Sequence, residues 1–140
     1  MQKILIPVDG SDYVLRAVKY AITQIRNGMS AQIHLLNVQE HLDGKVQAYL
    51  SLEKIKSIEL AAANEALDPV KRLLEEANIA YLASTRIGPV AKSIANYVEQ
   101  EKCDAIIMGT HGRGALGNLL LGSIMSEVIH LVQVPVTLIK

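Results

Sequence analysis

The stretch whose residue types and spacing could do chemistry is a glycine-rich segment in the last third of the chain. Five glycines stand between positions 109 and 122, after the short apolar run Asp104 to Gly109 and before an apolar pattern of helical period. A strand, a glycine-rich loop and a helix N-terminus in this order favour phosphate binding. Glycines let the main chain approach an anion, and the first helical amides point at it. The stretch therefore predicts a nucleotide site.

Two common phosphate motifs can be compared with these glycines. The pattern G-x-x-x-x-G-K-[ST] is absent, which excludes a P-loop. Gly112-x-Gly114-x-x-Gly117 matches the dinucleotide fingerprint by letter. That fingerprint, however, follows the first strand of its fold and has an acidic partner at the end of the second. Here the glycines follow the fourth predicted strand, and the second ends in Asn37-Val38, so this match is weak.

The elements that must position the loop follow from hydrophobic periodicity. Five apolar runs predict strands, and four segments of helical pattern separate them. The predicted strands are Lys3 to Val8, Gln32 to Val38, Ile79 to Ile87, Asp104 to Gly109 and Val134 to Ile139. This alternation predicts an α/β fold, an open five-stranded parallel sheet with helices on both faces, in a single domain over residues 1–140.

Two regions before the third strand are less regular. The polar stretch Glu40 to Lys45 predicts a loop. Val46 to Asn78 is helical in pattern, but Pro69 interrupts it, so either the helix kinks there or Asp68 caps a second helix. The third strand alternates more than the others, which predicts that one of its sides is partly exposed.

Strand order follows from the two turns that are richest in glycine and aspartate, after the first and fourth strands. In open α/β sheets, ligands bind outside the carboxyl ends of the strands where the order reverses. If these two strands are neighbours, the order is 3-2-1-4-5 and Asp9 faces the glycine loop. The fifth strand then lies at an edge, where a short apolar strand favours pairing with another chain. We expect a homodimer through Val134 to Ile139, unless the C-terminus around Lys140 merely covers the edge.

Composition narrows the functional class. The 140 residues are 50% hydrophobic and 20% charged, with 14 basic against 14 acidic side chains and no Trp or Phe. A nucleic-acid surface needs a basic stripe with aromatic platforms, so we expect no nucleic-acid partner. No apolar run reaches membrane-spanning length, and the first run predicts a strand rather than a signal peptide. The lone Cys103 fits a reducing compartment, so we expect a cytoplasmic protein.

Gly109-x-x-Gly112 followed nine residues later by Gly122-Ser123 resembles the ATP-binding signature of the universal stress protein family. The resemblance extends over the whole chain, because KILIPVDGS, Gly88-Pro89, DAIIMGTHGRG, LLGS and VPVTLIK stand in the order and spacing of that family. It implies ATP, or a related adenine nucleotide such as ADP or AMP, in the crevice of a 3-2-1-4-5 sheet. It further implies Mg²⁺ carried mainly by the phosphates, and usually a dimer.

The resemblance also implies roles for individual residues. Asp9 would hydrogen-bond the ribose, and Arg113 would supply the mobile positive charge. The implied contacts of the base and ribose are Pro7, Val8, Asp9, Val38, Met108 and Gly109. The implied contacts of the phosphates are Gly112, Arg113, Gly122, Ser123 and Ile124.

One residue departs from the family pattern. After Gly-Ser that pattern commonly runs Val and then Ser or Thr, whereas this chain has Ile124-Met125-Ser126. A thioether donates no hydrogen bond, so one phosphate contact is missing at Met125, or Ser126 partly replaces it.

Simpler interpretations of single residues stay open. Asp9 and Ser123 could each serve only as a helix cap, and His111 could be a solvated loop residue rather than a phosphate contact or a base. The other histidines lack ligand spacing, so no metal site is predicted. No catalytic set is recognisable. The leading hypothesis is a nucleotide-binding regulatory module of the stress response, with a slow ATPase or autophosphorylating enzyme, or a structural dimer without ligand, as alternatives.

Overall fold

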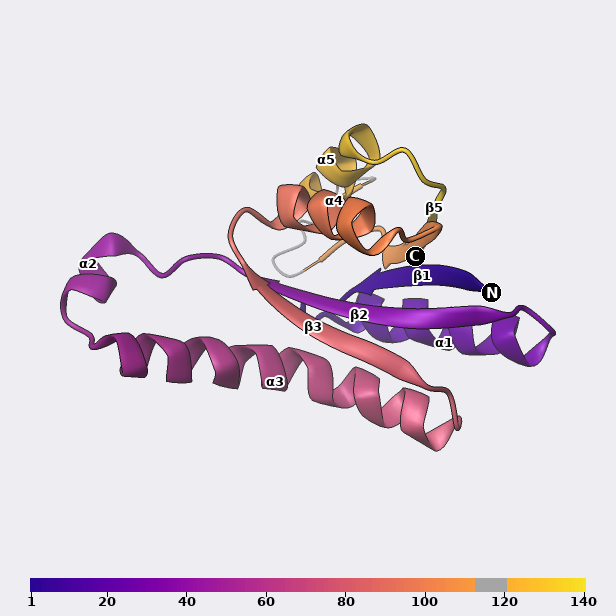
Figure 1. Cartoon of the computed structure of the whole chain (residues 1–140), viewed down its shortest axis with the longest axis horizontal. Helices are drawn as coiled ribbons and strands as arrows, with labels where there is room; N and C mark the ends of the chain where they lie inside the picture. Colours follow the sequence, from indigo (N-terminus) through magenta and orange to yellow (C-terminus); the bar gives the residue numbers. More distant parts are fainter. Residues whose placement is uncertain (113–120) are drawn as a thin grey trace.

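The five strands form one parallel sheet in the order β3-β2-β1-β4-β5 (Figure 1). A computed structural model of the chain describes residues 1–112 and 121–140. The strands are β1 (Gln2–Pro7), β2 (Ala31–Gln39), β3 (Tyr81–Ile87), β4 (Ala105–Gly109) and β5 (Val136–Ile139). The helices of the described residues are α1 (Asp12–Arg26), α2 (Gly44–Ala48), α3 (Leu52–Glu76), α4 (Val90–Glu101) and α5 (Ser123–Leu131). The predicted α/β class and strand order are both confirmed.

Side chains of the central strands alternate between two cores, one on each face of the sheet. On β1, Ile4 and Ile6 pack with α1 and α3, whereas Leu5 packs with α4 and α5. Figure 1 shows the same division, with α1 and α3 on one side of the sheet and α4 and α5 on the other. Because both faces are covered, β1 and β2 are buried on both sides and read as continuous apolar runs in the sequence.

The stretch predicted as a loop, Glu40 to Lys45, ends inside a short helix. Asp43 caps this helix, α2, and its carboxylate accepts a hydrogen bond of 2.7 Å from the Lys45 amide. The prediction was wrong at Gly44 and Lys45 because a five-residue helix has too few turns to show a hydrophobic period.

Helix α3 runs without a break through Pro69. Asp68 therefore lies inside the helix and does not cap a second one. Leu67 and Val70, on either side of the proline, are buried in the core under the sheet. Burial on both sides of the proline holds the helix together although its local hydrogen bonding is weakened.

The third strand is more exposed than its sequence pattern predicts. Tyr81 and Ser84 are half-buried, whereas neighbouring residues on both faces, such as Leu82 and Ala83, are exposed. β3 pairs only with β2 and forms one edge of the sheet, which explains why both faces are open.

Two further sequence observations can be compared with the described residues. None of the helices in the described part of the chain is both long and apolar enough to cross a membrane. Cys103 is buried just after α4 and packs with the core under α4 and α5. This position fits a small residue between helix and strand.

Candidate functional site

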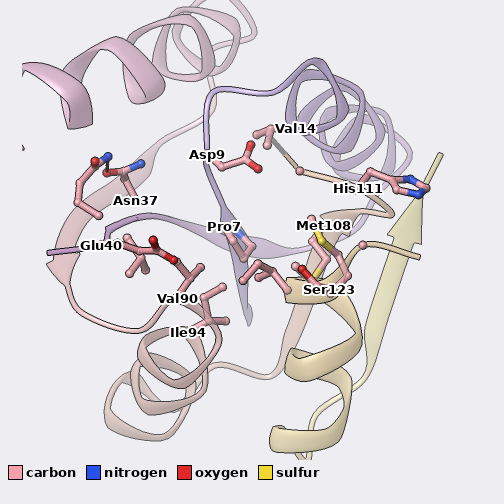
Figure 2. A pocket seen from close by; sticks show the side chains of 17 residues that line it. Pro7, Asp9, Val14, Asn37, Glu40, Val90, Ile94, Met108, His111 and Ser123 are labelled. Atoms are coloured by element: carbon pink, nitrogen blue, oxygen red, sulfur yellow. Dashed lines mark hydrogen bonds between the residues drawn. The ribbon is translucent and has the colours of Figure 1, made fainter. Parts of the chain in front are cut away.

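A cavity of about 720 Å³ lies beyond the carboxyl ends of β1, β2 and β4 (Figure 2). This is where the strand order reverses, the usual ligand position in open α/β sheets, and the volume suits a small-molecule ligand. Nine of the eleven residues predicted to contact a nucleotide line it. They are Pro7, Asp9, Val38, Met108, Gly109, Gly112, Gly122, Ser123 and Ile124.

The other two predicted residues are not among those that line the cavity. Val8 is 2% exposed and packs into the core with Ile4 and Ile6, because alternation along β1 turns its side chain to the α1 and α3 face. Arg113 lies outside the described residues, so its predicted phosphate contact stays a prediction.

Asp9 and Gly112, the last described residue at the start of the glycine loop, lie side by side at the cavity. The Asp9 carboxylate accepts a hydrogen bond of 2.9 Å from the Ser11 amide. Its other oxygen lies so close to Gly112 that a β-carbon there would collide with it. Ser11, and not Asp9, is the N-cap residue of α1, so the simple capping role does not explain Asp9. Figure 2 shows the carboxylate directed into the cavity.

The glycines that begin and end the loop, Gly109 and Gly122, are required by contacts within the protein itself. A β-carbon on Gly109 would lie 2.5 Å from the β-carbon of Tyr13 on α1. A β-carbon on Gly122 would lie 3.1 Å from the Met125 sulfur and 3.3 Å from the Thr110 carbonyl oxygen. Close packing therefore accounts for glycine at these positions, in addition to the open approach that an anion needs.

Thr110 ties the two ends of the glycine loop to the sheet. Its amide donates to the Ile139 carbonyl at 2.9 Å, and its own carbonyl accepts from the Gly122 amide at 2.7 Å. Gly122 is the N-cap of α5 and Ser123 is the first helical residue, so Ser123 is not a plain N-cap. The first amides of a helix have no partner within it, which leaves the amides of Ser123 and Ile124 beside the cavity.

Asn37 is a cavity residue that the sequence analysis missed. It is 1% exposed, and its amide nitrogen donates to the Val8 carbonyl at 2.8 Å. Its side-chain oxygen accepts from the Gln39 side chain at 2.7 Å. Asn37 thus joins the ends of β1 and β2. The available signal was a polar residue near the carboxyl end of the second strand, next to the switch point.

Seven more residues complete the lining. They are Val14, Gln39, Glu40, Val90, Ile94, Met125 and the loop residue His111. The His111 ring lies against the Tyr13 ring, with 5.4 Å between centroids, and its Nδ1 is 3.1 Å from the Thr110 hydroxyl. His111 is therefore held by neighbours, rather than being a simple solvated loop residue.

The titratable groups with displaced pKa values lie elsewhere. Burial lowers the pKa of His34, which hydrogen-bonds the Tyr97 hydroxyl at 2.8 Å on the sheet face under α4. Burial likewise raises the pKa of Tyr97 and of the Cys103 thiol. None of these three residues lines the cavity. Within residues 1–112 and 121–140, no cluster of three or more acidic, histidine or cysteine side chains is arranged to hold a metal ion.

Comparisons with known proteins agree with the geometry. The model of the universal stress protein family matches residues 1–140. Universal stress protein MJ0531 of Methanocaldococcus jannaschii is 34% identical over 99% of this chain and 82% of its own length. The solved structure of MJ0577, from the same organism, is 28% identical over 99% of this chain and 95% of that one, with a TM-score of 0.84.

A plant structure has the same fold at lower identity. It is a universal stress protein family protein of Arabidopsis thaliana with AMP bound, 20% identical, with a TM-score of 0.70 over all of this chain and 92% of that one. The family match over the full chain and the 34% identity agree with the fold, and the chain belongs to the universal stress protein family.

Proposed function

We propose that this protein is an adenine-nucleotide-binding regulatory module of the stress response, whose bound state alters dimer or partner surfaces. The observation that carries the proposal is the convergence of Asp9, the described glycines Gly109, Gly112 and Gly122, and the N-terminus of α5 on one cavity. An acidic side chain and a set of backbone amides are the two groups that a ribose phosphate needs.

Each part of the lining suits one part of an adenine nucleotide. Pro7, Val38 and Met108 offer apolar surface to the base. The Asp9 carboxylate is an acceptor for ribose hydroxyls. The first amides of α5 and the Ser123 hydroxyl donate to phosphate oxygens, aided by the helix dipole. Mg²⁺, where present, is carried through the phosphates of the nucleotide.

The relatives support the proposal in two ways. Membership of the family supports a role in the stress response. The plant structure holds AMP, which is a property of that protein, and its 20% identity supports a shared fold. The assignment to this chain therefore depends on the cavity and its donors.

The direct experiment is to denature the purified protein and identify any released nucleotide by mass spectrometry. Calorimetry with AMP, ADP and ATP, each with and without Mg²⁺, then measures affinity. Gly122→Val should abolish binding, because its side chain would collide with Met125 and Thr110. Gly44→Ala is the matched control, since a β-carbon there meets nothing within 4 Å. A protein without nucleotide affinity, and unchanged by Gly122→Val, would rule out the proposal.

A slow ATPase or autophosphorylating enzyme is the alternative that the lining of the cavity also favours. His111 and Asp9 both line the cavity, and either could position water or accept a proton. A turnover assay separates the two functions. Phosphate release that is lost in His111→Ala or Asp9→Ala would establish the enzyme, whereas binding without turnover would leave the regulatory module.

Two further parts of the proposal concern assembly and location. The protein forms a homodimer through its C-terminal strand, around residues Val134 to Ile139, because β5 is the edge strand beside β4. It works in the cytoplasm, where the single buried Cys103 needs no disulfide partner.

The remaining alternative is a structural dimer that has kept the loop without a ligand. Nucleotide that co-purifies with the protein would count against this alternative.

A further inference from the structure

We infer that the buried pair His34 and Tyr97 makes the nucleotide cavity sensitive to acid. Protonation of His34 loosens helix α4, which forms one wall of the cavity, and so weakens nucleotide binding. This regulation depends on the proposed nucleotide site and concerns that same site.

The pair joins the sheet to α4 in the interior of the protein. His34, on β2, is 2% exposed, and Tyr97, on α4, is 3% exposed. The His34 Nδ1 atom lies 2.8 Å from the Tyr97 hydroxyl, and the two rings meet edge to face with 5.9 Å between centroids. Apolar side chains such as Leu36 and Ile94 make up the core between the sheet and α4. The pair is therefore a polar contact inside an apolar interface.

The hydrogen-bond partners fit the neutral form of His34. Its Nε2 atom lies 3.4 Å from the side-chain oxygen of Gln32, which can only accept. Nε2 therefore carries the hydrogen, and Nδ1 accepts from the Tyr97 hydroxyl. The Tyr97 oxygen in turn hydrogen-bonds the Ser84 side chain on β3. A chain of hydrogen bonds thus runs from Ser84 through Tyr97 and His34 to Gln32.

A second proton on His34 disturbs this chain. Nδ1 becomes a donor that faces the hydroxyl hydrogen of Tyr97, so the hydroxyls of Tyr97 and Ser84 must both turn. The new positive charge would also lie in the interior, away from water. A buried charge is costly unless it is paired, so protonation favours a state in which α4 separates slightly from the sheet.

The surrounding charges oppose the second proton on balance. Each element beside the pair contributes a charged or titratable group, namely Lys3 of β1, Arg86 of β3, Glu101 of α4, and Cys103 and Asp104 after α4. The Arg86 guanidinium already lies over the Tyr97 ring, 5.5 Å from its centroid. Burial and the charge of Lys3 lower the pKa of His34, while the charge of Glu101 opposes them.

Helix α4 connects the pair to the cavity. Ile94 precedes Tyr97 by three residues and lies on the same buried face of the helix. Ile94 and Val90, one turn earlier, both line the cavity, and Figure 2 shows them on its α4 side. Packed helices slide as units, so a displacement at Tyr97 moves these two side chains as well. The apolar wall then fits the bound nucleotide less well.

The experiment measures affinity for AMP and for ATP by calorimetry between pH 7.5 and pH 4.5. Wild type is compared with His34→Gln and His34→Leu, which cannot be protonated, and circular dichroism checks folding at each pH. Acidification should weaken binding by wild type about 5-fold or more beyond the loss in these variants. One proton limits the difference to about 10-fold per pH unit.

Other titrating groups are common to all these proteins. The nucleotide phosphate titrates near pH 6, and His111 lines the cavity, so each protein has some pH dependence of its own. Their contributions cancel in the comparison of wild type with the His34 variants. His130→Gln, on the exposed side of α5, is the matched control and should follow wild type.

Hydrogen exchange on the protein without nucleotide tests the movement of α4 separately. Protection factors remove the intrinsic pH dependence of exchange. Those of the Ile94 and Tyr97 amides should fall on acidification in wild type and stay nearly constant in His34→Gln. Linkage is reciprocal, so bound AMP should lower the pKa of His34 further in an NMR titration.

The outcomes separate this inference from the function beneath it. Absence of binding at pH 7.5 would overturn the proposed function, and the regulation with it. Binding with the same pH dependence in wild type and the His34 variants would overturn the regulation and leave the function standing. Protection of α4 that does not change with pH in wild type would also overturn it. If one His34 variant fails to fold, the other still decides.

Discussion

The carboxylate of Asp9, from the turn after β1, lies directly against the backbone of Gly112, from the loop after β4. The two residues are far apart in the sequence, and pairing of β1 with β4 brings them together. Gly112 also lies beside the Met125 methyl group, 3.4 Å from where its β-carbon would be. The Asp9 carboxylate and the Met125 methyl group thus fill the space that a side chain at position 112 would take, and only a hydrogen atom fits there.

Replacement of Gly112 by alanine should weaken nucleotide binding more than it weakens folding. The new methyl group would push Asp9 or the loop out of place, and the expected loss of affinity for AMP is about 10-fold or more, measured by calorimetry. Gly44→Ala places the same methyl group in open space at the start of α2 and should leave affinity unchanged. Equal affinity of Gly112→Ala and wild type would show that Asp9 and Gly112 do not belong to the binding site.

Replacement of Asn37 by alanine should destabilise the protein by about 1–3 kcal/mol, because the buried Val8 carbonyl and the Gln39 amide would lose their partner. Urea unfolding followed by circular dichroism measures this free energy. Asn64→Ala, on the exposed face of α3, is the control and should change it by less than about 0.5 kcal/mol. Similar values for the two variants would mean that Asn37 does not hold β1 and β2 together.

Stability should fall as the pH is lowered below about 6.5 because of His34. Burial, and next the charge of Lys3, lower the pKa of His34 from its ordinary 6.5, while Glu101 opposes them. Between the folded and unfolded pKa values the unfolded chain binds the proton and the folded chain does not. The contribution of His34 to the free energy of unfolding is therefore complete above pH 6.5. It is lost as the pH falls below that value, by at most about 1.4 kcal/mol per pH unit.

Urea unfolding at pH 7.5 and pH 5.5 checks the His34 prediction. The loss of unfolding free energy at pH 5.5 should be smaller in His34→Gln than in wild type. His130→Gln, on the exposed side of α5, is the control and should retain the wild-type difference. An identical pH dependence in wild type and His34→Gln would contradict the prediction.

Replacement of Leu138 by proline should convert the proposed dimer into a monomer. Hydrogen bonds to β4 involve the carbonyls of Pro135 and Ile139, so the amide of Leu138 faces away from β4 toward the edge. Proline removes that amide and leaves the bonds to β4 in place. Light scattering after size exclusion measures the mass, and circular dichroism checks folding.

Thr137→Ala, an exposed position on the same strand, is the control for the dimer and should remain dimeric. A wild type that is monomeric at micromolar concentration would contradict the proposed homodimer. A Leu138→Pro variant that stays dimeric would place the interface elsewhere on the protein.

Much of this protein is determined by local patterns in its sequence. Continuous apolar runs identify the buried strands, because strands covered on both faces carry no polar alternation. The glycine and aspartate turns after the first and fourth strands identify the switch point, and from it the order 3-2-1-4-5 follows. Residue types and spacing were therefore enough to assign Asp9, Gly112 and Gly122 to one crevice.

Only the tertiary structure decided what each of these residues touches. The side chain of Val8 packs into the core, although its neighbours Pro7 and Asp9 line the cavity. The direction of each side chain here depends on the pleat of the backbone at the end of β1. The need for glycine at position 109 comes from Tyr13, on a helix that is distant in sequence. Asn37 gained its role in the same way, since packing between separate elements depends on the whole fold and leaves no periodic mark in the sequence.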